Sequence, residues 1–352
     1  MNLLLGQNRR YSVLYVVNKP VRGKIREHYP TQIGVWECMD GRTRMESATE
    51  MPAGILQSWE NGGARFDLRW PHFQTSFMDW YGHARKNGRP CVVLVSWHRS
   101  RSNVHLGCKA HRYDDAAAEA LARAQVKELW SRFKEDDGKR HLYPIEVCLE
   151  TDSETMIFQR RKDSATLDVS GLEILSQPEA QKRLQGFYPD VPPCVLDDLL
   201  ATIIAGNIRH IQKVRSMGRT VEECDHCESI IAVGRGLEWL DKRAFIIGPF
   251  DPRFPDMVET AAKIVLENFH KGTVDVAGGA MLLASTPFRE CLGRPGREMA
   301  GLRASSLLDT AHTVIKERVP DLVPHLRYTI AGTVSNDTRR FLPVDVVRQG
   351  QS

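Results

Sequence analysis

The chain has 352 residues, which is enough for two domains or for one large domain with a substantial hydrophobic core. Its hydrophobic fraction of 42% and its charged fraction of 26% exclude a disordered or fibrous protein, and its net charge of +4 is too small to indicate a nucleic-acid partner. The eight cysteines lack the dense spacing of a small disulfide-rich secreted protein, so we expect reduced thiols, some of them metal ligands.

No segment predicts export or a membrane span. The apolar run 1–5 is too short for a signal sequence, and the stretch after Arg9-Arg10 is interrupted at Asn18-Lys19. No stretch approaches the ~20 apolar residues that cross a bilayer. We therefore expect a soluble, cytoplasmic protein.

Residues 1–31 contain one apolar run, Val13–Val17, followed by a basic stretch. We expect an N-terminal arm here, which either packs on another subunit or forms an edge strand and a loop. A strand over 33–37 follows. The later Gly62-Gly63 pair predicts either an ordinary turn or a place where two backbone segments approach closely.

Helices and strands then alternate up to residue 149. Trp70-Pro71 begins a helix that ends at Asn87-Gly88. Its apolar positions form one stripe that we expect in the core: Phe73, Phe77, Trp80 and Ala84. Continuous apolar runs predict buried strands at 92–97 and 144–149, with a helix over 114–133 between them. This order predicts an α/β fold with a mainly parallel sheet flanked by helices, in which ligands bind at the carboxyl ends of the strands.

The second half has a similar pattern, and we expect a domain boundary near residue 193. The predicted domains are an N-terminal arm (1–31), a metal-binding catalytic domain (32–193) and a C-terminal domain (194–352). The predicted elements of the last domain are a helix over 195–214, strands at 230–233 and 244–247, and helices near 237 and over 256–269. Segment 326–338 resembles segment 143–155, which suggests a diverged duplication whose second copy has lost its metal ligands. Gly234-Arg235-Gly236 would then lie where the first copy has Cys38.

Three residues after the first predicted strand suggest a metal site. Cys38 ends the strand, and Asp40 and Arg42 follow at alternate positions. Cys108 lies beyond the next apolar strand, before a helix, where a thiolate is favoured. A histidine completes the set: His98 stands at the strand end, whereas His105 gives a compact His-x-x-Cys spacing. Two cysteines and one histidine suit zinc and leave a fourth position open for water, as in catalytic sites.

Asp40 and Arg42 suggest how such a site would work. Zinc-bound hydroxide forms near neutral pH, and a neighbouring carboxylate can orient it toward a substrate carbon. Arg42 could hold Asp40 with two N–H groups, keep it ionised and keep it off the metal. Release of the proton would need a shuttle, for which the sequence offers three histidines: His72, His105 and His111.

These residues resemble the β-class carbonic anhydrases, and more closely their carboxysome shell branch. The similar segments are Cys38-Met39-Asp40-Gly41-Arg42, residues 63–67, Trp97-His98, residues 105–111 and residues 231–236. The resemblance implies that Cys38, His98 and Cys108 bind zinc, that Asp40 and Arg42 are catalytic, and that carbon dioxide is hydrated reversibly to bicarbonate. It also implies a C-terminal domain of related fold without zinc, and at least a homodimer. The family carries a long N-terminal helical region tied to carboxysomes and Rubisco, whereas 37 residues precede Cys38 here.

Two alternatives stay open at this stage. Carbonyl sulfide or carbon disulfide could be hydrolysed on the same site, since only the pocket shape would differ. The chain could also be a non-catalytic scaffold stabilised by zinc. The motif Cys224-Asp225-His226-Cys227 has Cys-x-x-Cys spacing, but no second such pair follows to close a structural zinc site, so we interpret it as a loop.

Overall fold

The computed structural model describes residues 2–134, 140–163, 165–218, 225–275 and 277–348. The chain divides into two compact units. The first unit comprises Pro20–Cys38 and Thr43–Cys224, and the second comprises Met1–Lys19, Met39–Arg42 and Asp225–Ser352. Each unit has its own sheet and its own helices.

The sheet of the first unit has six strands in the order β2-β1-β3-β4-β5-β6. The pairs among β2, β1, β3 and β4 are parallel, and β5 and β6 continue the sheet in antiparallel pairs. The strands are β1 (Gln32–Cys38), β2 (Gln57–Asn61), β3 (Cys91–Arg99), β4 (Leu142–Glu150), β5 (Thr155–Gln159) and β6 (Thr166–Asp168). The predicted strands at 33–37, 92–97 and 144–149 are confirmed, and so is the mainly parallel α/β architecture.

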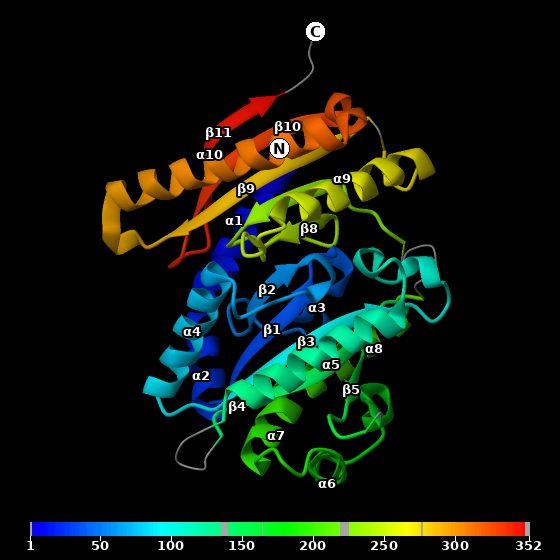
Figure 1. Ribbon diagram of the computed structural model, residues 1–352. Coiled ribbons are helices and arrows are strands. Elements are labelled where there is room, and N and C mark those ends of the chain that lie inside the picture. The colour runs from blue at the N-terminus through cyan, green and yellow to red at the C-terminus, as the bar shows by residue number, and fades with distance from the viewer. Residues whose placement is uncertain (1, 135–139, 164, 219–224, 276, 349–352) are drawn as a thin grey trace. The chain divides into compact units, whose positions relative to one another are not determined.

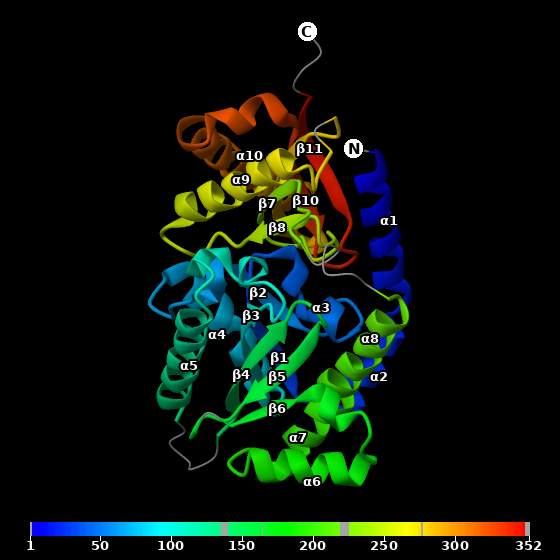
Figure 2. The same cartoon turned by 90° about the vertical axis from the view of Figure 1, so that its right-hand side faces the viewer.

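Helices cover both faces of this sheet, α4 and α5 on one side and α7 and α8 on the other (Figures 1 and 2). The helices are α2 (Lys19–His28), α3 (Met45–Ala48), α4 (Pro71–Lys86), α5 (Asp115–Arg132), α6 (Gln177–Phe187), α7 (Pro193–Leu199) and α8 (Ala205–Ser216), with a π-helix at Leu200–Ile204. Because both faces are covered, most side chains of β3 and β4 are apolar. Three of the four predicted stripe positions on α4 are confirmed as core, because Phe73, Phe77 and Ala84 are buried, whereas Trp80 is half-buried. Phe77 packs near Trp36 and Trp59.

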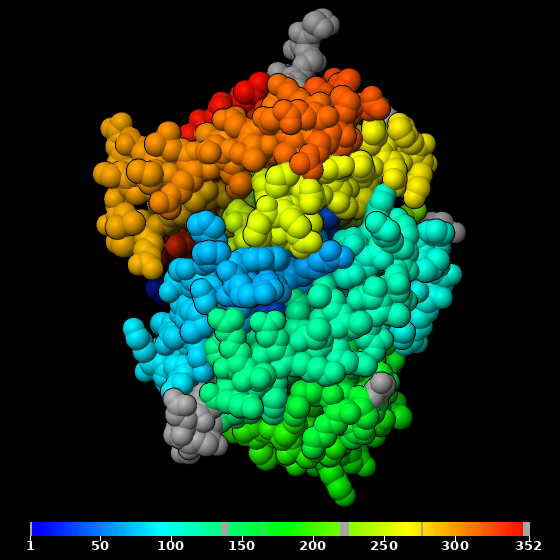
Figure 3. All heavy atoms as spheres, viewed as in Figure 1, coloured from blue at the N-terminus to red at the C-terminus, as the bar shows by residue number. Residues whose placement is uncertain are grey.

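The second unit contains a five-stranded sheet in the order β11-β10-β9-β7-β8. Its strands are β7 (Ile230–Gly234), β8 (Ala244–Ile247), β9 (Ala280–Phe288), β10 (Leu326–Ser335) and β11 (Phe341–Arg348), of which only β11 is antiparallel to its neighbour. Helices α9 (Phe254–Lys271) and α10 (Gly293–Arg318) cover one face and α1 (Asn2–Val17) lies on the other (Figure 2). The beginning of α10, drawn in orange, lies at the surface (Figure 3).

The structure differs from the sequence predictions at three places. The segment 1–31 is not an edge strand but forms the helices α1 and α2. The helix expected near residue 237 is a turn. The helices over 193–216 belong to the first unit, where their apolar side chains join its core, and this unit extends to Cys224, so no division between the units falls at residue 193. Among the described residues, none of the helices combines the length and hydropathy that a membrane span requires.

Candidate metal centre

The first unit brings the three predicted ligands together. Cys38 ends β1, His98 lies near the end of β3, and Cys108 follows in the loop before α5. Their ligand atoms all lie within 4.8 Å of one another, and all three side chains are buried. His105, the alternative ligand, is exposed and does not belong to this group.

The distance between the two sulfur atoms fits a metal. The Sγ atoms of Cys38 and Cys108 are 3.9 Å apart. Two Zn–S bonds of ~2.3 Å at a tetrahedral angle place the sulfurs roughly 3.8 Å apart. The group could therefore hold a metal ion, and its two thiols and one imidazole are compatible with zinc.

The electrostatics of the thiols also favour a cation between them. The neighbouring Cys108 thiol, together with burial, raises the pKa of Cys38 well above its ordinary value, although His98 lowers it. Two buried thiols at this distance cannot both ionise without a positive charge that compensates them. Metal binding would supply that charge and would release their protons.

Two adjacent strands and one loop, which is held by hydrogen bonds to Asp152, position the three ligands. Strands β1 and β3 are parallel neighbours, so Cys38 and His98 reach the same edge of the sheet. Asp152, in the turn after β4, accepts hydrogen bonds from the amides of Arg101 (2.9 Å) and Ser102 (2.8 Å). This carboxylate holds the loop that leads from β3 to Cys108.

Gly63, in the short 3-10 helix after β2, is in close contact with His111, which lies three residues after Cys108. His111 Nε2 donates to the Gly63 carbonyl oxygen at 3.0 Å, and a Cβ on Gly63 would lie 2.6 Å from that nitrogen. The paired glycines therefore do permit a close approach. Of the three shuttle candidates, His72 and His105 are exposed, whereas His111 is buried and its pKa is lowered by burial.

Asp40 and Arg42 belong to the second unit, and they form the two-pronged ion pair that the sequence predicted. Arg42 Nε donates to Asp40 Oδ1 at 3.0 Å and Nη2 donates to Oδ2 at 2.6 Å. Both side chains are buried. Burial alone would lower the pKa of Arg42, but the Asp40 carboxylate outweighs it and raises that pKa. The role of the pair in a reaction stays a prediction.

Two further buried residues in the second unit contact this pair, and the sequence did not predict them. His226 Nε2 lies 2.9 Å from Arg42 Nη2, and His226 Nδ1 lies 2.9 Å from Glu228 Oε2. The interpretation of the Cys-x-x-Cys motif as a loop gives His226 no role, and Cys224 of that motif lies outside the described residues. The one signal available was a histidine flanked by acidic residues just before a strand.

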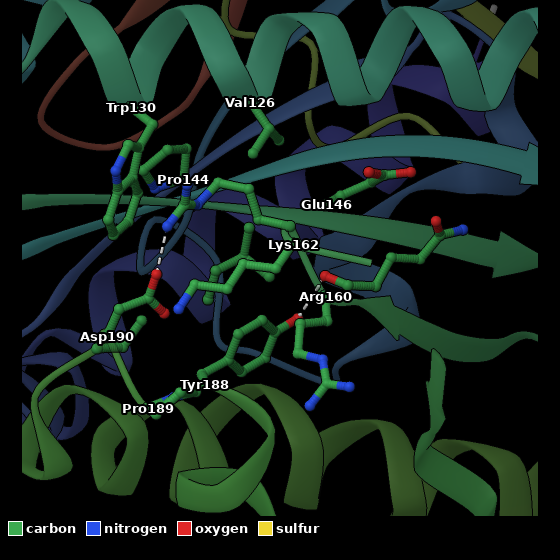
Figure 4. Close-up of a pocket in the computed structure, with 13 residues that line it drawn as sticks. Val126, Trp130, Pro144, Glu146, Arg160, Lys162, Tyr188, Pro189 and Asp190 are labelled. Carbon is green, nitrogen blue, oxygen red and sulfur yellow. Dashed lines mark hydrogen bonds and ion pairs between the residues drawn. The ribbon is translucent and has the colours of Figure 1, made fainter. Parts of the chain in front are cut away.

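Figure 4 shows the residues that line a small cavity in the first unit. It holds about 20 Å³, room for one water molecule. Arg161 pairs there with Asp190, and its guanidinium carbon lies 4.0 Å from the ring centroid of Trp130. The Tyr188 hydroxyl donates to the Gln159 carbonyl. None of the predicted ligands lines this cavity.

The fold and the ligand group thus define an α/β protein with a candidate metal centre. No protein-family model and no curated protein sequence matches this chain.

Proposed function

We propose that this chain is a zinc-dependent carbonic anhydrase that interconverts carbon dioxide and bicarbonate. One observation carries the proposal: a buried Cys38–His98–Cys108 group is followed in the chain, two residues after its first ligand, by a buried Asp40–Arg42 ion pair. A structural zinc site has no need of such a pair, because its ligands alone close the coordination shell.

Cys38, His98 and Cys108 would hold the ion through two thiolates and one imidazole nitrogen. When bound, zinc would supply a Lewis acid that lowers the pKa of a water molecule to about 7. Because the group has three ligands among the residues that the structure describes, it leaves a position through which water and substrate could reach the ion.

Asp40 would orient the attacking water. Two residues of chain span at most about 7 Å, so Asp40 remains near Cys38. Its carboxylate would accept a hydrogen bond from the water and direct a lone pair of the water oxygen toward the carbon of the substrate. Arg42 donates to Asp40 Oδ1 from both its backbone amide and Nε, and to Oδ2 from Nη2. It would keep Asp40 ionised and prevent it from becoming a fourth ligand.

The resemblance to β-class carbonic anhydrases also leads us to propose a homodimer or larger homo-oligomer, which analytical ultracentrifugation would test. A carboxysome or Rubisco partner is a further consequence of the resemblance to the carboxysome shell branch. The described residues carry no observation that favours it.

The first experiment measures zinc content and the stopped-flow rate of carbon dioxide hydration, on the parent protein and on Asp40→Ala. We expect stoichiometric zinc in both proteins and a rate at least about 10²-fold lower in the variant, because the variant loses the group that orients the water. Zinc without hydration in the parent would refute the proposal, and turnover of carbonyl sulfide or carbon disulfide would then be measured.

Two histidine variants provide a matched pair. His98→Ala should lose zinc, whereas His105→Ala, which changes an exposed histidine of the same region outside the ligand group, should keep zinc. The scaffold alternative predicts another pattern, in which Asp40→Ala changes nothing measurable and Cys108→Ser loses the fold together with the metal.

A further inference from the structure

The Asp40–Arg42 pair is one end of a longer row of polar side chains in the second unit. Arg42 Nη2 lies 2.6 Å from Asp40 Oδ2 and 2.9 Å from His226 Nε2, and His226 Nδ1 lies 2.9 Å from Glu228 Oε2. All four side chains are buried. We call Asp40, Arg42, His226 and Glu228 the dyad relay.

The donors and acceptors of the dyad relay fix the protonation of His226. A guanidinium group has donors only, so His226 Nε2 has to accept the hydrogen bond from Arg42. The proton of the neutral imidazole then resides on Nδ1 and is donated to Glu228. Glu228 therefore selects the one tautomer of His226 that can accept from Arg42.

Arg42 occupies the place of a cation in this cluster. The ligand atoms of Asp40, His226 and Glu228 lie within 4.8 Å of one another, a spacing that a metal site could have. Arg42 Nη2 is within hydrogen-bond distance of two of these three residues, and its positive charge faces their carboxylates. A metal would have to displace a buried arginine that is hydrogen-bonded to both Asp40 and His226, which is strongly unfavourable. Asp40, His226 and Glu228 therefore surround the guanidinium group of Arg42 rather than a metal ion.

The dyad relay is poorly explained as a device for stability. Glu228 is fully buried, and its Oε1 atom has no hydrogen-bond partner among the described residues. A buried carboxylate with an unsatisfied oxygen lowers stability, and apolar residues of similar size are often the more stable choice for such networks. The presence of this buried network is better explained by the geometry that it imposes on Arg42.

Both ends of the dyad relay are anchored to regular structure of the second unit. Asn268 of α9 donates to the backbone carbonyl of Glu228 at 3.0 Å. The Met39 carbonyl accepts from the Ile246 amide of β8, also at 3.0 Å. The segment that carries Asp40 and Arg42 is thus fixed in this unit through its backbone as well as through its side chains.

We propose that His226 and Glu228 are positioning residues that hold Arg42 on Asp40, and that the second unit contributes to the reaction in this way although it holds none of the three predicted ligands. The catalytic consequence rests on the proposed carbonic anhydrase function. The positioning itself does not, so the two parts can be tested apart.

The first test is a measurement on the full chain with isotope-labelled histidine. Long-range nitrogen–proton NMR correlations identify the tautomer of each neutral imidazole, and the His226→Gln variant assigns the His226 signals. At neutral pH we expect His226 to carry its proton on Nδ1 in the parent, and to lose that preference in Glu228→Ala. An Nε2-protonated His226 in the parent would overturn the proposal, whatever the activity.

The second test measures kcat, KM and zinc content. Glu228→Ala and His226→Ala should each lower kcat about 10- to 100-fold with KM and zinc content unchanged, the size seen when outer partners of a metal site are removed. His226→Gln should recover part of the loss, because its amide oxygen can accept from Arg42. The matched control is Asp241→Asn, which breaks an exposed pair with Arg243 in the same unit.

The outcomes separate the two proposals. Unchanged kcat in both alanine variants, with zinc retained, would overturn the positioning role. A parent that binds zinc but does not hydrate carbon dioxide would overturn the proposed function, and the NMR result would still decide the positioning. If the alanine variants do not fold, the spectrum of the parent and the kinetics of His226→Gln decide the question.

Discussion

Glu146 is a buried carboxyl group whose charged form is disfavoured by the fold. Burial raises its pKa from an ordinary 4.5 to about 7, although Arg123, whose Nε lies 3.3 Å from Oε2, lowers it. Between these two pH values the folded protein binds a proton that the unfolded chain has released. The resulting stabilisation, up to about 3 kcal/mol, is fully present below the lower value and is lost as the pH rises through the upper one.

Replacing this group should therefore change how stability depends on pH. Glu146→Gln cannot titrate, so its free energy of unfolding should fall less between mildly acidic and mildly alkaline pH than that of the parent. Urea unfolding of the zinc-loaded protein at both pH values measures this difference. Glu119→Gln is the matched control, because Glu119 pairs with the same arginine but is part-exposed. If the free energy of unfolding changed with pH equally in the parent and in Glu146→Gln, burial would not shift the pKa of Glu146.

At the scale of residues, the sequence predicted the ligand group better than its surroundings. Cys38, His98 and Cys108 each end or follow an apolar strand, and parallel strands bring such positions to one edge. The local pattern was sufficient for the two cysteines, whereas it left His98 and His105 as alternatives. The contact of Arg42 with His226 joins residues 184 positions apart. No periodicity or spacing encodes that distance, and only the packing of the second unit reveals it.

At the scale of elements, the prediction succeeded where hydrophobicity follows burial and failed where it does not. Helices α4 and α5 have apolar stripes that face the core, and both were predicted nearly to their ends. Helix α1 does not follow this relation between hydrophobicity and burial. Its buried positions include Asn8 and Ser12, whereas Val13 and Leu14 are exposed. Asn8 is buried because it bonds the backbone at Arg339 and Phe341, a contact that a hydrophobic pattern cannot predict.

The segment Met39–Arg42 is short, but its backbone fit in the second unit is close. A Cβ on Gly41 would lie 2.4 Å from the Lys242 carbonyl oxygen and 2.7 Å from that of Ala244. Gly41→Ala should therefore lower the free energy of unfolding by about 1–3 kcal/mol, since backbone atoms would have to move. It should also lower kcat, because the segment carries the Asp40–Arg42 pair.

The control for this substitution is Gly6→Ala in α1, where an added Cβ meets nothing within 4 Å. That variant should be more stable than the parent by about 0.5–1 kcal/mol, as expected for alanine in place of glycine within a helix. Urea unfolding followed by circular dichroism compares the two. Equal stability of Gly41→Ala and the parent would mean that the segment is free to shift.

At the scale of the whole molecule, the two sheets share one topology. The order β2-β1-β3-β4-β5 in the first unit has the same strand sequence and the same directions as β8-β7-β9-β10-β11 in the second, with the last strand antiparallel in each. In this correspondence β4 matches β10, the pair whose sequences resemble each other, and Gly234 at the end of β7 matches Cys38. The duplication stays a prediction, but the shared order gives it a structural basis.

This correspondence explains why the second unit lacks a metal site of the same kind. A Cβ on Gly234 would lie 2.0 Å from the Ser285 carbonyl oxygen, so no cysteine fits where the first unit has one. The other metal-like cluster, around Asp40, already contains the guanidinium of Arg42. Each described unit therefore offers zinc a different environment, and only the first offers it thiolates together with a histidine.

We accordingly expect one zinc ion per chain rather than two. Elemental analysis of the purified protein should give one in the parent, nearly none in Cys38→Ser, and one in Cys148→Ser, which changes another buried thiol of the same sheet that is not in the ligand group. Two ions in the parent and one in Cys38→Ser would show that Asp40, His226 and Glu228 bind metal in place of Arg42. In that case Asp40 would be a ligand, and it could not also orient the attacking water.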